Sequence, residues 1–93
     1  MKIPNKLRID GEDWIISKDS DLIRNENNYG EVDHLQRKIS LDKNAPKIPV
    51  TLLHECIHVV SENGKLDLEE KQVARLAYGI YAIIRDNKLR FDE

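Results

Sequence analysis

The most apolar run in the chain, TLLHECIHVV at residues 51–60, carries two histidines and a glutamate. Leucine, isoleucine, valine and cysteine surround His54, Glu55 and His58, in a chain of which 34% of the residues are charged. Polar groups that are taken out of water cost free energy unless they find partners. Any fold of this chain must therefore bury the apolar residues of this run and also give its three polar side chains something to bind.

The spacing of these three residues is typical of a metal site on a helix. Each residue of an α-helix advances by about 100°, so His54 and His58 lie one turn apart on the same face. Glu55 projects beside the point that the two imidazoles share. A helical H-E-x-x-H sequence is a known zinc-site pattern in which the glutamate acts as general base. We predict His54 and His58 as metal ligands and Glu55 as the catalytic base, against the alternative of two core histidines on an ordinary amphipathic helix.

A catalytic zinc usually takes a third protein ligand. The downstream candidates are Glu62, Asp67, Glu69 and Glu70. Glu70 heads the apolar stripe of a second predicted helix, whereas Glu69 lies about 100° away from that stripe. We predict Glu70 as the third ligand. The alternative is that Glu70 only closes a capping box, with Asp67 as the N-cap residue.

The remaining pattern predicts short strands before the two helices. Asp10-Gly11 stands between β-prone runs and indicates a hairpin, and the polar residues 18–30 are expected to form a loop. Residues 30–33 and 37–41 are expected to pair as a second hairpin. One helix is predicted over residues 50–62 and another from Asp67 to about residue 87. We therefore expect an α+β fold, with an antiparallel sheet of three to four strands followed by an active-site helix and a second, C-terminal helix.

Composition narrows the function classes. The 93 residues suit one domain, over residues 1–93, and the net charge of −2 offers no basic surplus for nucleic acid. No segment approaches the roughly 20 apolar residues that span a bilayer. With one cysteine, no disulfide can form within the chain. We expect a cytoplasmic protein without nucleic-acid or membrane partners, and the pattern leaves its oligomeric state open.

The run TLLHECIHVV, followed about a dozen residues later by EEKQVARLAYGIYAII, resembles the small gluzincin-type zinc metallopeptidases of bacteria and phages, the minigluzincin and ImmA/IrrE-like group. The upstream YGEVDHLQRKISLDK is similar to the strand pair that precedes their active-site helix. Glu70, Val73, Leu76 and Ala77 match the spacing of the E-x-x-A-x-x-F-A segment that supplies the family's third ligand. Tyr78 departs from the pattern, because that position is expected to hold asparagine.

The resemblance implies peptide hydrolysis with one Zn²⁺ held by His54, His58 and Glu70. Glu55 would act as general base toward a metal-activated water. It also implies a protein or peptide substrate, bound in extended form along the strand pair, and relatives suggest a regulatory protein as the substrate. The runner-up function is a non-catalytic, zinc-stabilised protein-binding module of phage or bacterial origin.

Six further side chains have candidate places at the site or in the core. Tyr29, His34, Tyr78 and Tyr81 are candidates for an oxyanion-stabilising donor, although core packing is favoured for Tyr81 and a solvated surface position for His34. For Cys56 a buried free thiol is favoured over a ligand or nucleophile. Trp14 is expected to be a core aromatic.

Overall fold

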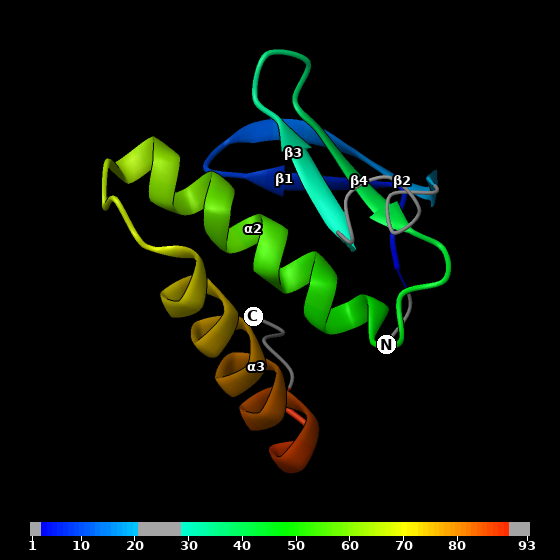
Figure 1. Cartoon of the computed structure of the whole chain (residues 1–93), viewed down its shortest axis with the longest axis vertical. Coiled ribbons are helices and arrows are strands. Elements are labelled where there is room, and N and C mark those ends of the chain that lie inside the picture. The colour runs from blue at the N-terminus through cyan, green and yellow to red at the C-terminus, as the bar shows by residue number, and fades with distance from the viewer. Residues whose placement is uncertain (1–2, 21–28, 90–93) are drawn as a thin grey trace.

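A computed structural model of the chain describes residues 3–20 and 29–89, and it confirms the α+β fold. Four strands form one sheet and two helices follow it (Figure 1). The elements, in chain order, are β1 (Lys6–Ile9), β2 (Glu12–Ser20), β3 (Gly30–Asp33), β4 (Lys38–Asp42), α2 (Ile48–Gly64) and α3 (Glu70–Asn87). None of the described helices is long and apolar enough to cross a membrane.

The sheet is mixed, so the prediction of a purely antiparallel sheet was wrong. Its strand order is β1-β2-β4-β3, with antiparallel pairing in both hairpins and parallel pairing between β2 and β4. The turn residues of each hairpin indicate that hairpin in the sequence. The way in which the two hairpins join depends on pairing between distant segments, which local patterns do not encode. The result leaves β3 at a free edge of the sheet, next to α2.

Strand β2 is longer than predicted. The polar residues 18–20, expected to begin a loop, continue the strand, and Ser20 is paired with Asp42 of β4. The strand conformation of residues 18–20 comes from backbone pairing with a neighbouring strand rather than from apolar side chains. The rest of the predicted loop, residues 21–28, lies outside the described residues.

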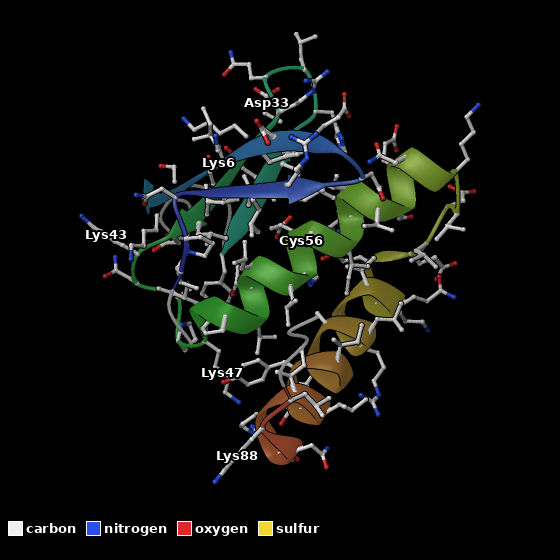
Figure 2. All side chains as sticks on the ribbon, turned by 180° about the vertical axis from the view of Figure 1, so that it is seen from behind. Lys6, Asp33, Lys43, Lys47, Cys56 and Lys88 are labelled. Atoms are coloured by element: carbon white, nitrogen blue, oxygen red, sulfur yellow. The ribbon has the colours of Figure 1, made fainter. Side chains whose placement is uncertain are left out.

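The core lies between one face of the sheet and α2. Its buried cluster comprises Ile9, Trp14, Ile16, Ile39, Leu41, Leu52 and Val59. Trp14 is only 2% exposed, which confirms it as a core aromatic. Helix α2 lies between the sheet and α3, as Figure 1 shows. Charged side chains such as Lys43 and Lys88 project outward (Figure 2).

A matched pair of isoleucines tests this core. Ile39 is 0% exposed on β4, whereas Ile15 is 57% exposed on the neighbouring β2. We expect Ile39→Ala to lower the free energy of unfolding by about 3 kcal/mol, because it leaves a cavity. Ile15→Ala should cost less than about 1 kcal/mol. Urea denaturation of the metal-free protein measures both, and equal losses would show that the assigned core is wrong.

Candidate metal and active site

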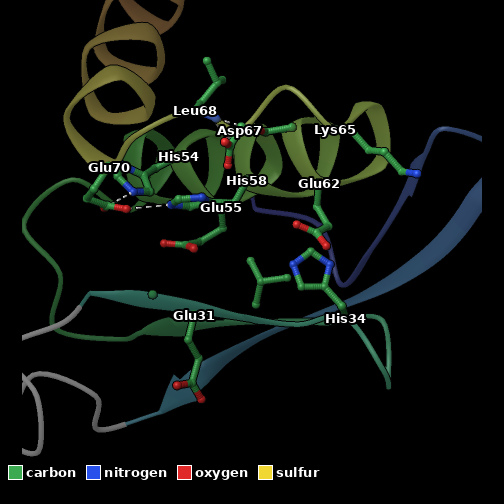
Figure 3. Close-up of a pocket in the computed structure, with 13 residues that line it drawn as sticks. Glu31, His34, His54, Glu55, His58, Glu62, Lys65, Asp67, Leu68 and Glu70 are labelled. Carbon is green, nitrogen blue, oxygen red and sulfur yellow. Dashed lines mark hydrogen bonds and ion pairs between the residues drawn. The ribbon is translucent and has the colours of Figure 1, made fainter.

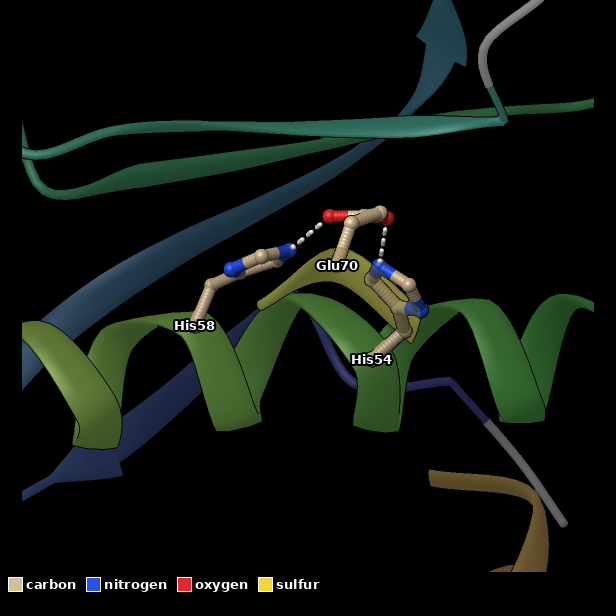
Figure 4. Close-up of side chains that lie close together, drawn as sticks. All are labelled: His54, His58 and Glu70. Carbon is tan, nitrogen blue, oxygen red and sulfur yellow. Dashed lines mark hydrogen bonds and ion pairs between the residues drawn. The ribbon is translucent and has the colours of Figure 1, made fainter. Parts of the chain in front are cut away.

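Helix α2 presents two histidines on one edge. His54 and His58 lie one turn apart, with ring centroids separated by 4.9 Å and ring planes at 60° (Figure 4). The helix ends at Lys65, which adopts the left-handed conformation and donates its backbone N–H toward the carbonyls of the last turn. Burial of Leu52 and Val59 against the sheet fixes the rotation of α2, and this rotation turns the histidine edge toward the start of α3.

Glu70, the predicted third ligand, lies against both histidines. One carboxylate oxygen lies 2.6 Å from Nε2 of His54 and the other lies 2.9 Å from Nε2 of His58. The ligand atoms of His54, His58 and Glu70 all lie within 4.8 Å of one another, and this group could hold a metal ion. The three side chains come from two different helices, so a bound ion would also join α2 to α3.

The start of α3 differs from the prediction and explains why Glu70 is available. The helix begins at Glu70, and its capping box consists of Glu69 and Gln72 instead of Asp67 and Glu70. The backbone N–H of Glu69 donates to Oε1 of Gln72 at 2.8 Å. Gln72 suits the N3 position of a capping box, but glutamate is not a usual N-cap residue, so the sequence pattern favours Asp67 over Glu69. Because Glu69 caps the helix, the Glu70 carboxylate can point at the histidines.

The link between the helices sets the position of Glu70. Ser61, buried at the end of α2, accepts two backbone hydrogen bonds from this link, one from Leu66 at its carbonyl and one from Leu68 at its hydroxyl. Val73 and Ala77, both 0% exposed, then pack α3 against α2. The apolar stripe that Glu70 heads is thus buried at these two residues.

Glu55 lies beside the histidines and is buried. It is 7% exposed, and Figure 3 shows it in the same cleft as His54, His58 and Glu70. Burial, followed by the negative charges of Glu70 and Glu31, raises the pKa of Glu55 from 4.5 to about 7. A carboxyl group whose pKa lies near neutral pH can both accept and release a proton there.

The cleft runs between α2 and the edge strand β3. It has a volume of about 870 Å³, and its lining includes the metal-ligand group and Glu55 together with Gly30 and Val32 of β3. Beyond them lie residues that were not predicted as part of a site, among them Ser61 and Lys65. Nothing in the local pattern marks these two, because their membership depends on how the α2–α3 link folds back.

The structure separates the four oxyanion candidates. His34 lines the cleft, and its ring meets Trp14 edge to face at 5.9 Å. Tyr29 borders a smaller cavity that also contacts His54 and Glu55. Tyr78 and Tyr81 line a different cavity with Pro46 and Arg85, so the structure does not bring them to the cluster.

Cys56 of α2, labelled in Figure 2, packs against the core and lines a pocket that none of His54, His58 and Glu70 borders. Burial, and then the charge of Glu55, raises the pKa of its thiol from 9.0 to about 11. The thiol therefore stays protonated at neutral pH and is a poor nucleophile. This agrees with the predicted free, buried cysteine, although the side chain is only partly buried.

In comparisons with protein-family models, curated proteins and solved structures, this chain matches none of them. The assignment of a function to this chain therefore depends on the geometry described above and on the sequence pattern.

The burial of Glu55 predicts a pH-dependent cost in the metal-free protein. Its folded pKa lies above the unfolded value of 4.5, so the folded chain keeps a proton that the unfolded chain has released. This lowers stability as pH rises from about 4.5 to about 7, and the full cost remains above that range. With a chelator present, we expect Glu55→Gln to be more stable than the wild type by about 2 kcal/mol at pH 8.

That difference should nearly vanish at pH 4.5, because Glu55 is then neutral in the folded wild type and only about half ionised in the unfolded chain, so little of the cost has developed. Urea denaturation of the two proteins at both pH values provides the measurement, and other titrating groups cancel in the comparison. A stability difference that does not change with pH would contradict the burial of an ionisable Glu55.

Proposed function

We propose that this protein is a zinc-dependent metalloendopeptidase of the small gluzincin type, similar to the minigluzincin and ImmA/IrrE-like enzymes. The observation that carries the proposal is the meeting of His54, His58 and Glu70 beside the buried carboxylate of Glu55. A metal site that only stabilised the fold would not need a fourth, buried acid next to it.

The donor set suits zinc. Two imidazole nitrogens and one carboxylate form a ligand set that catalytic zinc takes, with a further position left for water or substrate. All three side chains line the cleft, so a ligand entering it can reach them. Zinc bound there would act as a Lewis acid that lowers the pKa of a water molecule and polarises a peptide carbonyl.

Glu55 would perform the proton transfers. It would accept a proton from the attacking water and pass it to the departing amine. Its burial supports this role because a carboxyl group shielded from water keeps a pKa near neutral in the metal-free protein. A cation beside it would lower that pKa by favouring the ionised form, which is the form that accepts a proton.

The free edge of β3 supports an extended peptide as the substrate. The backbone N–H of Asp42 donates to the carbonyl of Tyr29 at 2.8 Å, and Gly30 is paired with Leu41. In an antiparallel ladder, this alternation directs the N–H and C=O groups of Gly30 and Val32 away from β4. Gly30 is buried and Val32 is partly exposed, so among the described residues Val32 offers the accessible backbone groups. A peptide could add there as a further strand, with its backbone along the cleft.

The zinc site is tested with two neighbouring glutamates. We expect the wild type to bind about one zinc ion and Glu70→Gln to weaken zinc binding at least about 100-fold. Glu69→Gln is the matched control, because it removes the neighbouring carboxylate charge but no predicted ligand, and its amide oxygen can still accept the cap hydrogen bond. Competition with a chelating dye measures affinity, and metal analysis gives the stoichiometry. Equal loss in both variants would exclude Glu70 as the third ligand, and zinc content unchanged by His54→Ala would exclude the site.

The enzymatic proposal is tested with Glu55→Gln. This variant should keep its zinc and lower kcat/KM for peptide cleavage at least about 100-fold, because it removes the general base. Mass spectrometry of a diverse peptide library identifies cleaved substrates for the wild type. The contradicting outcome is a wild type that binds zinc but shows no peptide cleavage that depends on Glu55. The chain would then be better explained as a zinc-stabilised protein-binding module.

A further inference from the structure

Gly30 lies directly against the side chain of Glu55. A Cβ atom added to Gly30 would lie 2.8 Å from Oε2, 3.0 Å from Cγ and 3.1 Å from Cδ of Glu55. Carbon atoms that are not bonded prefer separations of about 3.5–4.0 Å. Any larger residue at position 30 therefore requires Glu55 or β3 to move.

The backbone conformation gives no other reason for glycine at this position. Gly30 has no positive φ angle; among the glycines only Gly11 does. The would-be Cβ atoms of the other three glycines meet no residue of the metal cluster and no part of Glu55. At Gly79 the nearest atom is the guanidinium end of Arg75, 3.0 Å away, which can swing aside. The lack of a side chain at Gly30 is thus required by space for Glu55.

Packing is also what holds the Glu55 carboxylate. Within residues 3–20 and 29–89, no hydrogen bond or ion pair connects it to another side chain or to the backbone. A buried side chain without such partners takes the position that its neighbours leave open. The open position here lies between α2 and the bare backbone of Gly30, which also lines the cleft. Figure 3 shows Glu55 directed into this cleft.

We propose that Gly30 is a positioning residue for peptide hydrolysis: its missing side chain creates the space that holds the Glu55 carboxylate between β3 and the His54–His58–Glu70 cluster. A Cβ atom there would displace the carboxylate while leaving the three ligands in place. The catalytic part of this inference rests on the proposed peptidase function, whereas the contact between Gly30 and Glu55 does not.

The kinetic test compares Gly30→Ala with Gly79→Ala. We expect Gly30→Ala to lower kcat about 10- to 100-fold, since small misplacements of a catalytic group have effects of this size. Zinc affinity and KM should change less than about threefold, because the ligands and the β3 edge stay in place. Gly79→Ala, which adds the same methyl group on α3, should leave kcat unchanged. Unchanged kcat in Gly30→Ala, or a parallel loss of zinc affinity, would overturn the positioning role.

Shortening the acid provides the rescue. Glu55→Asp withdraws the carboxylate by one methylene and makes room for the added Cβ atom. Gly30→Ala should therefore lower kcat by a smaller factor in the Glu55→Asp background than in the wild type. The two factors should differ at least about threefold. Equal effects in the two backgrounds would show that Gly30 does not act through Glu55.

A stability cycle tests the contact without any activity measurement. In the metal-free protein, Gly30→Ala should lower Tm by about 5–15 °C, as overpacking does in small domains. In the Glu55→Ala background, the same change should lower Tm by less than about 3 °C. Equal shifts would overturn the contact. If the wild type cleaves no peptide, the proposed function and the catalytic part of this inference both fail, while the Tm cycle still decides the contact.

Discussion

The burial of α2 on two sides is the constraint on which the site depends. Leu52 and Val59 press one side of the helix into the sheet, and Val73 and Ala77 cover another side from α3. These contacts fix the rotation of the helix about its own axis. A helix that rotated freely would present its histidines in many directions, and the convergence on Glu70 would be lost. Apolar packing thus supplies the precision that a metal site requires.

The elements that could be predicted are those that residues close together in the sequence determine. The i, i+4 spacing of the histidines and the apolar stripe of the second helix led to the three predicted ligands, which the structure brings together, because helical periodicity converts spacing directly into direction. The two hairpins were also recognisable from their turns. Glu70 was harder, since a carboxylate near a helix start can serve either as a cap or as a ligand. In the structure the cap is Glu69, which leaves the Glu70 carboxylate beside the two histidines.

What could not be predicted depends on contacts between distant segments. The parallel pairing of β2 with β4 has no local signal, and it determines that β3 forms the free edge beside α2. The depth of Glu55 likewise follows from where β3 lies, and so does the need for glycine at position 30. Periodicity tells which face of a helix a residue occupies, but not what stands opposite to that face.

The mixed sheet also means that two parts of the site, the His54–His58–Glu70 group and the contact between Gly30 and Glu55, depend on contacts of different range along the chain. Glu70 is 16 residues from His54 and 12 from His58, so the ligand group belongs to one helical hairpin and closes a short loop. Gly30 reaches Glu55 only through β3, which joins the sheet by way of β4 and the long-range pairing with β2. Contacts that close longer loops carry a larger entropic cost and form more slowly. The approach of His54, His58 and Glu70 is therefore a local property of the two helices, whereas the placement of Glu55 against Gly30 requires the completed sheet.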